Sequence, residues 1–311
     1  MNKNVIVLFS GGLDSILVYK IVRAWGFEPV AITLTSPFIK KLDKEYYRKK
    51  QGINFREIDF TNVQYEAIKS PIYGYGKAIN PCIDCHAAMI RMAKEEMEKE
   101  GAAFIATGEV VGQRPMSQRK DAMNSVEKLS GVKGYIVRPL SGGLLAPTIP
   151  EKNGMIKREW LYKITGRGRK EQYQLCEEFG IEDIPSSGGG CLLTEKSFIG
   201  RVKTVIKYDN RIALNYIKYG RMFDLEGTLF ILARNEEESE YIFRNGGDKV
   251  IFPKNRIGPT GIILGKGKEI EACKIIGRYS KGEGKHIECE YRGEIIKTEV
   301  YNEKNIDTIV D

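Results

Sequence analysis

A short polar turn near the amino terminus combines residue types that bind phosphate. The turn reads SGGLDS over residues 10–15, follows an apolar run at residues 5–9 and leads into an apolar helical pattern. A strand, a glycine-rich loop and a helix in this order direct backbone N–H groups and a helix N-terminus at one place, and this arrangement binds phosphate. Gly11 and Gly12 allow close backbone approach, Ser10 and Ser15 add hydroxyl donors, and Asp14 can cap the helix or help to hold Mg²⁺.

Three cysteines form a second candidate site. Cys82 and Cys85 are three positions apart at the predicted start of a helix, and Cys191 follows three glycines. A helix N-terminus lowers the pKa of a thiol, so Cys82 and Cys85 are expected to be thiolates. The pair has three ordinary interpretations: a zinc site, which usually needs four ligands, a redox dithiol, or part of an iron–sulfur cluster that leaves one iron without a protein ligand. The other cysteines are expected to be structural: Cys176, Cys273 and Cys289.

The elements that must position these residues alternate between strand and helix. Apolar strand patterns are followed by helical patterns at a spacing that predicts an α/β fold with a doubly wound parallel sheet. In such sheets ligands lie at the carboxyl ends of the strands, so Gly108, which follows one strand, is a candidate nucleotide contact. The predicted strands are 4–9, 29–35, 53–60, 102–107 and 134–140; the predicted helices are 14–25 and 85–100, with a charged helical stretch at 40–50.

The second part of the chain has a different pattern of predicted secondary structure. Glycine- and proline-rich sequence follows residue 140, and from about residue 200 short strands are separated by turns. The sequence therefore predicts two domains, residues 1–200 and a smaller α+β domain at 201–311. The strands expected in the latter are 228–233, 249–252, 261–264, 286–291 and 295–301.

Composition excludes several classes of protein. Hydrophobic residues make up 42% and charged residues 29% of the 311, which is normal for a soluble globular protein. No apolar run approaches the roughly 20 residues of a membrane helix, and the amino terminus lacks the features of a signal peptide. A cytoplasmic protein with no membrane partner is expected. Six cysteines are too few for a disulfide scaffold.

Positive charge is concentrated in one segment. The net charge is +8, and residues 114–170 alone contain 13 Lys and Arg against 4 Asp and Glu. This surplus is either a solvated basic face or a surface for a polyanion such as nucleic acid.

The motifs together resemble a known family. SGGLDS is similar to the pyrophosphatase (PP) loop of the N-type ATP pyrophosphatases, and residues 1 to about 200 resemble the tRNA thiouridine synthetases. NPCIDCH, residues 80–86, and SGGGC, residues 187–191, are similar to the segments that hold the two reactive cysteines of the tRNA 2-thiouridylases, although Cys82 stands where Asp is frequent there. ATGEVVGQ at 106–113, SQ at 117–118 and VRPL at 137–140 are similar to the 4-thiouridine synthetases instead, so neither the modified position nor the ring carbon carries over.

The resemblance implies an adenine nucleotide alpha hydrolase-like fold and an ATP-dependent tRNA sulfurtransferase. ATP, with Mg²⁺, would adenylate a pyrimidine carbonyl oxygen, and sulfur would then displace AMP. The implied catalytic residues are Cys85, Cys191 and Asp14. The implied nucleotide-binding residues are Ser10, Gly11, Gly12, Asp14, Ser15, Leu34, Thr35 and Gly108.

Two routes of sulfur delivery remain open. In one, Cys82, Cys85 and Cys191 hold a [4Fe–4S] cluster whose fourth iron takes sulfide. In the other, Cys191 carries a persulfide and Cys85 resolves it as a disulfide. The third thiol, Cys82, favours the cluster. The sulfur donor is sulfide or a cysteine desulfurase, and a homodimer is left open.

The basic segment and the carboxyl-terminal domain then suggest RNA as the partner, tRNA or another RNA. GRMF at 220–223 with LARNEEE at 232–238 is similar to a small domain of a ribosome-quality-control family that is predicted to bind RNA; the alternative is a scaffold with a solvated acidic helix. The candidate phosphate-binding residues of the basic segment are Arg114, Arg119, Lys120, Arg158, Lys163, Arg167, Arg169 and Lys170.

Two other functions compete with this hypothesis. A PP-loop ATP pyrophosphatase acting on a small molecule would keep the loop but would not need the basic segment. A non-catalytic RNA-binding protein with a structural zinc would not need an intact SGGLDS loop.

Overall fold

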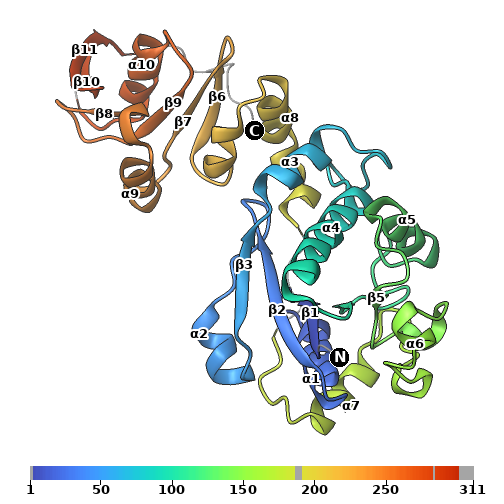
Figure 1. Cartoon of the computed structure of the whole chain (residues 1–311). Helices are drawn as coiled ribbons and strands as arrows, with labels where there is room; N and C mark the ends of the chain where they lie inside the picture. The colour runs from blue at the N-terminus through green and yellow to red at the C-terminus, as the bar shows by residue number, and fades with distance from the viewer. Residues whose placement is uncertain (1–2, 186–190, 283, 301–311) are drawn as a thin grey trace. The chain divides into compact units, whose positions relative to one another are not determined.

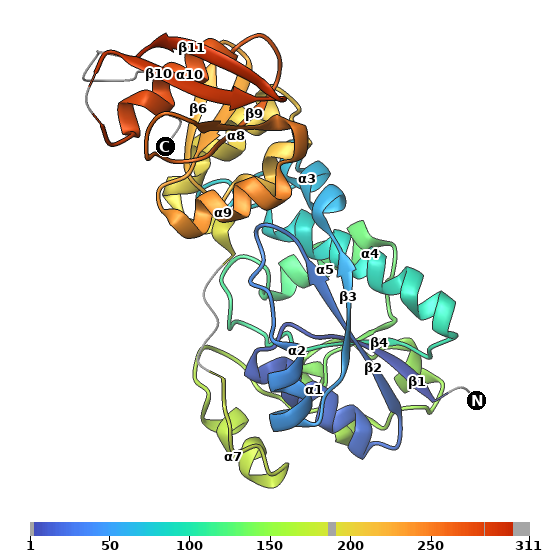
Figure 2. The same cartoon turned by 90° about the vertical axis from the view of Figure 1, so that its left-hand side faces the viewer.

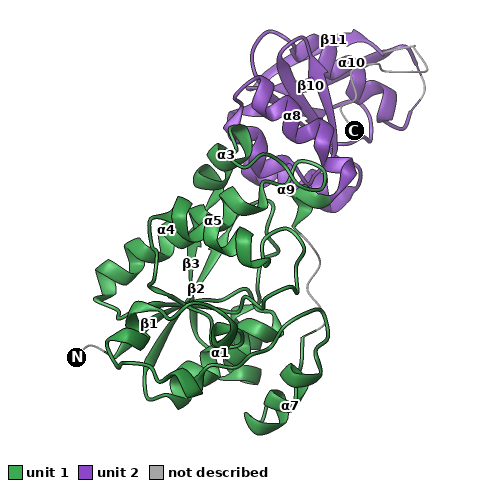
Figure 3. Ribbon diagram, turned by 90° about the vertical axis from the view of Figure 1, so that its right-hand side faces the viewer, with its two compact units in different colours: residues 1–194 green, residues 195–311 purple. Residues whose placement is uncertain are grey.

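The computed structural model describes residues 3–185, 191–282 and 284–300. The chain divides into two compact units, Met1–Thr194 and Glu195–Asp311 (Figure 3). The sequence placed this division at residues 200 and 201. Each unit is described by itself below.

The first unit is built on a parallel sheet of five strands. Their order is β3-β2-β1-β4-β5, which places β1 at the centre. Each strand pairs in parallel with its neighbours; Val7, for example, is opposite Ala31 on one side and Ala106 on the other. The predicted α/β class with a doubly wound parallel sheet is therefore confirmed. The strands are β1 (Asn4–Leu8), β2 (Glu28–Thr35), β3 (Phe55–Asp59), β4 (Ile105–Thr107) and β5 (Ile136–Val137).

Alternate residues of the central strand face different helices, because successive side chains of a strand point to opposite faces. Val5 and Val7 belong to an apolar core with residues of α1 (Leu13–Ala24) and α7 (Lys170–Glu178). Ile6 belongs to a second core with residues of α4 (Cys82–Glu100) and α5 (Lys120–Ser130). Figure 3 shows the two helical layers on either side of the sheet.

Several elements are shorter than predicted or were not predicted. The segment at residues 40–50 forms α2 (Lys44–Tyr46), followed by the π-helical turn η1 (Tyr47–Gln51). The expected strand at 134–140 pairs at only two residues, because the chain then turns to place Arg138 in the interior. Elements without a sequence prediction are α3 (Thr61–Lys69), α5, α6 (Ile149–Lys152), η2 (Gly142–Leu144), η3 (Arg158–Trp160) and η4 (Leu192–Thr194).

The second unit contains an antiparallel sheet of order β11-β10-β8-β9-β7-β6 (Figure 2). α10 packs against this sheet, and the apolar core includes Phe223, Phe230, Ile276 and Ile287. All five strands predicted here are confirmed, and β6 is an addition. The elements are η5 (Lys196–Phe198), α8 (Ile199–Lys207), η6 (Arg211–Tyr216), β6 (Arg221–Leu225), β7 (Thr228–Leu232), α9 (Glu236–Asn245), η7 (Gly247–Lys249), β8 (Val250–Pro253), β9 (Gly261–Leu264), α10 (Glu269–Tyr279), β10 (His286–Tyr291) and β11 (Glu294–Glu299).

The RNA-binding motif suggested for the second unit is largely engaged in internal contacts. Glu238 is buried, accepts hydrogen bonds from the backbone N–H groups of Gly220 and Arg234, and pairs with the Arg234 guanidinium. A Cβ on Gly220, whose φ is +60°, would lie 2.4 Å from the carbonyl oxygen of Leu232. Glu236, Glu237 and Glu240 of α9 are exposed, as expected for a solvated acidic helix, whereas Glu238 is buried. Within the described ranges of both units, no helix has the length and apolarity to cross a membrane.

Candidate functional site

The glycine turn between β1 and α1 is closed by a tyrosine from the π-helical turn. Gly11 has φ +72°, and the Tyr47 hydroxyl donates a hydrogen bond of 2.7 Å to its carbonyl oxygen. A Cβ at Gly11 would lie 2.5 Å from that hydroxyl oxygen. Both the positive φ and the close approach of Tyr47 therefore require glycine at this position.

The hydroxyls expected to bind phosphate lie on the same turn. Ser15 Oγ donates to the carbonyl oxygen of Gly12 over 2.7 Å, and Ser10 Oγ is 3.4 Å from Ser15 Oγ. Gly12 is the residue that precedes α1, so the helix N-terminus begins at this turn. The loop thus combines hydroxyl groups and a helix N-terminus, which suits an anion.

The Asp14 carboxylate is held by two glutamine side chains. Gln113 Nε2 donates to Asp14 Oδ2 over 2.8 Å, and Gln172 Nε2 lies 3.5 Å from Asp14 Oδ1. Gln172 is fully buried, and its Oε1 has no hydrogen-bond partner among the described residues. Carboxylate and amide oxygens are ligands that Mg²⁺ takes, so this donor set fits a magnesium ion beside phosphates.

Gly108 packs directly against the start of α1. A Cβ on this residue would lie 2.8 Å from the carbonyl carbon of Asp14 and 2.9 Å from the amide nitrogen of Ser15. Of the other predicted nucleotide contacts, Leu34 is buried in an apolar cluster with Phe60 and Ala88, and Thr35 is half-buried at the end of β2.

The two cysteines of the Cys-x-x-Cys pair lie in the first turn of α4, as predicted. Asn80 hydrogen-bonds the sulfur of Cys82, and Gln64 of α3 hydrogen-bonds the sulfur of Cys85. Asp84, between them, is buried and accepts hydrogen bonds from the backbone N–H groups of residues 72 and 73. The start of α4 is therefore fixed by side chains on both sides of the cysteines.

The third cysteine comes to the same place from a distant part of the sequence. Cys191 and Cys82 both act electrostatically on the Cys85 thiol. The residues after Cys191 are anchored there, because Leu192 N–H donates to the Phe38 carbonyl and Ile79 N–H donates to the Leu193 carbonyl. The three glycines before Cys191 lie outside the described residues. In the part of the chain that the structure describes, no three His, Cys, Asp or Glu side chains are already arranged as a metal site.

The expected thiolate character of the pair is wrong for the protein as described. Burial raises the pKa of Cys85 far above its usual value, and the neighbouring Cys191 raises it further. Burial also raises the pKa of Cys82, although Arg114 and Asn80 partly oppose this. Desolvation of a thiolate outweighs the favourable helix N-terminus here, so both groups are neutral thiols at neutral pH.

A buried charge network braces the start of α4 against the sheet. His86 Nδ1 is 3.5 Å from Glu109 Oε1, and Arg138 Nε donates to Glu109 Oε2 over 2.8 Å. Arg138 also pairs with Glu127 of α5. Burial would raise the pKa of Glu109, but the charges of Arg138 and His86 together hold it well below its usual range.

The candidate phosphate-binding cations occupy different surroundings. The Arg158 guanidinium pairs with Glu151 and donates to the carbonyl oxygens of residues 143 and 145, so it organises a loop. Arg119 pairs with Asp121. Arg169 is half-buried, and the remaining candidates are exposed: Arg114, Lys120, Lys163, Arg167 and Lys170.

The turn that carries Arg167, Arg169 and Lys170 borders the nucleotide loop. Gly166 N–H donates to the Val111 carbonyl, two residues before Gln113, and α7 begins at Lys170 and carries Gln172. Both glutamines contact Asp14. The structure thus brings this basic turn next to residues that position Asp14.

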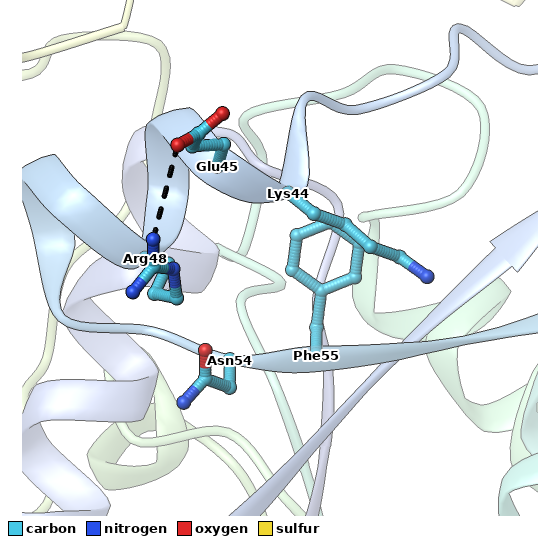
Figure 4. A pocket seen from close by; sticks show the side chains of 5 residues that line it. All are labelled: Lys44, Glu45, Arg48, Asn54 and Phe55. Carbon is cyan, nitrogen blue, oxygen red and sulfur yellow. Dashed lines mark ion pairs between the residues drawn. The ribbon is translucent and has the colours of Figure 1, made fainter.

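A pocket of about 360 Å³ lies elsewhere (Figure 4). It is lined by Lys44, Glu45, Arg48, Asn54 and Phe55. Asn54 and Phe55 are at the amino end of β3, whereas the nucleotide loop follows the carboxyl end of β1. We assign this pocket no part in the site.

Sequence reasoning missed the side chains that support the site. Tyr47, Gln64, Asn80, Gln113 and Gln172 each contact a predicted site residue. Two signals in the sequence could have revealed most of them: Asn80 and Gln113 lie within the motifs NPCIDCH and ATGEVVGQ, and Gln64 and Gln172 are glutamines on the buried faces of helices.

Comparisons with known proteins show what this chain is similar to. Residues 1–144 match the family model described as "Thiamine biosynthesis protein (ThiI)". The tRNA-specific 2-thiouridylase MnmA of Rippkaea orientalis is 26% identical over 246 residues, covering 73% of this chain and 63% of that protein. The MnmA of Trichormus variabilis is 27% identical over 196 residues, covering 56% and 54%. The chain therefore spans less than two thirds of the length of these curated relatives.

Solved structures show a looser likeness. A 4-thiouridine synthetase–RNA complex with bound ATP has a TM-score of 0.37 at 19% identity, covering 70% of this chain and 52% of that one. The U34-tRNA thiolase NcsA from Methanococcus maripaludis with its [4Fe-4S] cluster has a TM-score of 0.34 at 14% identity, covering 70% and 69%.

Proposed function

We propose that the protein is an ATP-dependent sulfurtransferase that acts on tRNA, because residues 1–144 match the ThiI family model and the chain is similar to the tRNA-specific 2-thiouridylase MnmA. The observation that supports this best is that one unit holds both a phosphate-binding turn with an oriented Asp14 and three neighbouring thiols. The target is a pyrimidine carbonyl, and the reaction consumes ATP and yields AMP and pyrophosphate.

The glycine turn performs the first step. Ser10, Gly12 and Ser15 would bind the phosphates of ATP, and Asp14, oriented by Gln113 and Gln172, would hold Mg²⁺ beside them. The pyrimidine carbonyl oxygen attacks the α-phosphorus and pyrophosphate leaves. Adenylation converts the oxygen into part of a good leaving group, because it departs as AMP in the next step.

The cysteines supply the replacement atom. An iron–sulfur cluster suits this donor set, since Cys82 and Cys191 both act electrostatically on Cys85 and three thiols would leave one iron without a protein ligand. When bound, such a cluster would present sulfide. Cys82, Cys85 and Cys191 would hold it as thiolates, so binding releases their protons despite the raised pKa values. In the alternative route, a cysteine desulfurase supplies the outer sulfur of a Cys191 persulfide. This sulfur attacks the adenylated carbon and AMP leaves; Cys85 then attacks the Cys191 sulfur, which frees the thiocarbonyl and leaves a Cys85–Cys191 disulfide that an external thiol reduces.

RNA is the proposed partner because of the basic segment at residues 114–170. A base inside a stacked helix is inaccessible to these groups, so the target nucleotide must be unstacked. The second unit would add further RNA contacts. Charge reversal of both Arg167 and Arg169 to Glu is expected to weaken tRNA binding and to reduce its salt dependence.

An assay that measures both AMP and thionucleosides tests the proposed function. The anaerobically purified protein is incubated with ATP, unfractionated tRNA and, in parallel samples, either sulfide or a cysteine desulfurase with cysteine; AMP is quantified and the digested nucleosides are analysed by mass spectrometry. A thionucleoside that forms with the wild type and not with Asp14→Asn supports the proposal. AMP formation without any thionucleoside contradicts it. Iron content and colour separate the two sulfur routes, because a colourless, iron-free and fully active protein eliminates the cluster.

A small-molecule substrate is the second candidate. The matching family model is described as a thiamine biosynthesis protein, which favours sulfur insertion during cofactor synthesis. This alternative predicts that tRNA neither stimulates AMP formation nor copurifies with the protein.

A further inference from the structure

The connection between α3 and α4 can be followed in Figure 1. Its first part, residues 70–77, is called the 70–77 loop and exposes three large side chains. Ile72 is 74% exposed, and Tyr73 and Tyr75 are each 45% exposed. Apolar and aromatic surface concentrated within four positions of a loop marks an interaction surface rather than a scattered exposed residue. We refer to Tyr73 and Tyr75 as the tyrosine pair.

The loop is held in place by hydrogen bonds. The Asp84 carboxylate accepts from the N–H groups of Ile72 at 2.7 Å and Tyr73 at 3.1 Å. The Tyr75 hydroxyl donates to the Ile68 carbonyl, and Gly76 N–H donates to the Asn80 carbonyl over 2.8 Å. These contacts fix the backbone while the rings remain partly in solvent.

The same contacts place the tyrosine pair beside the cysteine site. Asp84 lies between Cys82 and Cys85 on the first turn of α4. Asn80, which accepts from the loop, hydrogen-bonds Cys82 with its side chain. The 70–77 loop therefore adjoins the first turn of α4, which carries these thiols.

The surroundings of the loop are basic. Residues 69–77 and 114–120 contain Lys69, Lys77, Arg114, Arg119 and Lys120 and no acidic residue. The two segments adjoin, because a Cβ on Gly76 would lie 2.6 Å from Met116 Cε. Arg119 pairs with Asp121, whereas Arg114 acts on the Cys82 thiol. Aromatic rings among cations are typical of surfaces that bind single-stranded nucleic acid.

We propose that the tyrosine pair stacks on unpaired bases that flank the target nucleotide of an RNA loop, while Arg114 and Lys77 neutralise the adjacent phosphates. This inference rests on the proposed function and names the form in which the substrate binds. Extruding a base costs its stacking on neighbours, and aromatic side chains replace that stacking regardless of base identity. The cations favour RNA over a protein as the occupant.

Binding of a single-stranded probe tests the inference. Tyr73→Ala is expected to weaken binding of poly(U) by about 5- to 150-fold, the range for loss of one base–aromatic stack. Tyr73→Phe keeps the ring and should bind within about twofold of wild type. Tyr135→Ala is the matched control, because Tyr135 is 39% exposed but precedes β5 at the opposite ends of the strands.

The salt dependence distinguishes stacking from charge. Arg114→Gln should reduce the slope of log K against log salt by about 0.7, the value for one phosphate of a single strand, whereas Tyr73→Ala should leave the slope unchanged. Thermal unfolding of each variant shows whether the loop change has altered the fold. Tyr75→Ala serves as a second stacking variant, with Tyr75→Phe to separate the ring from its hydrogen bond to Ile68.

Three results would overturn the inference. In the first, a folded Tyr73→Ala protein binds poly(U) with wild-type affinity. In the second, Tyr73→Phe loses as much poly(U) affinity as Tyr73→Ala does. In the third, Tyr73→Ala weakens binding of a protein but leaves poly(U) binding unchanged. Failure of the proposed function looks different: the wild type would then form no thionucleoside, whatever the tyrosine variants do to RNA binding.

Discussion

The nucleotide loop and the cysteine site are built in opposite ways. The loop is one continuous stretch of six residues, fixed by a positive φ at Gly11 and by contacts to Tyr47 and Gln113. The cysteine site is assembled from segments more than a hundred positions apart, and burial keeps its thiols protonated. Under the proposed function, the first site needs little rearrangement to bind phosphate, whereas the thiols of the second must lose protons to act as metal ligands or nucleophiles.

The largest effect is expected for Cys191, which is needed for sulfur transfer but not for adenylation. Cys191→Ala should lower thionucleoside formation by on the order of 10⁴-fold, as for loss of a reacting nucleophile. Release of pyrophosphate, which depends on the loop, should persist. Mass spectrometry and a pyrophosphate assay on one sample measure both. Equal loss of both products would show that the sites do not work as separate parts.

The next effect concerns the packing of the loop. Gly108→Val would place side-chain atoms against the backbone of Asp14 and Ser15, and overpacking of this kind costs about 1–3 kcal/mol. ATP affinity should fall together with the melting temperature. Gly168→Ala is the control, because no described atom lies within 4 Å of its Cβ position. Unchanged ATP affinity in a folded Gly108→Val would contradict the close approach.

A smaller effect is expected from the side chain that orients Asp14. Gln113→Ala removes a hydrogen bond to a charged group, which contributes about 1.5–3 kcal/mol, so the rate of adenylation should fall by roughly 10- to 150-fold. The measurement is AMP formation as a function of Mg²⁺ concentration. If Asp14 holds Mg²⁺, the variant should need a higher Mg²⁺ concentration for half-maximal AMP formation. A rate loss that is the same at every Mg²⁺ concentration would show that Gln113 does not act through the metal.

The smallest effect lies in the acid range and involves the brace of α4. Because the pKa of Glu109 is lowered in the folded state, its contribution to stability is complete above its unfolded pKa and is lost as pH falls through the folded value. Glu109→Gln should therefore flatten the decline of stability below about pH 4.5. Urea unfolding of wild type and variant between pH 7 and pH 3 measures this. If the free energy of unfolding falls equally with pH in wild type and variant, the Glu109 network is not the source of the acid-range decline.

Local patterns were sufficient for the strands and the loop but not for the supporting contacts. The apolar runs at β1 and β2 and the SGGLDS turn carry their own geometry, so both the α/β fold and the position of the loop could be predicted. The contact of Tyr47 with Gly11 joins residues 36 positions apart through an unusual turn, which no periodicity reveals. The raised pKa of Cys85 depends on burial and on the neighbouring Cys191, which is 106 positions away in the sequence, and no local pattern shows either.

The π-helical turn at Tyr47–Gln51 has a consequence for chain length. Successive residues of an α-helix are rotated by about 100°, so removal of one residue here, which would restore an ordinary helix, would turn the Tyr47 ring away from Gly11. The carbonyl of the glycine turn would then lose its donor although no residue of SGGLDS had changed. The spacing in this segment is therefore under the same constraint as the loop itself, and insertions or deletions there are expected to be as harmful as substitutions of the glycines.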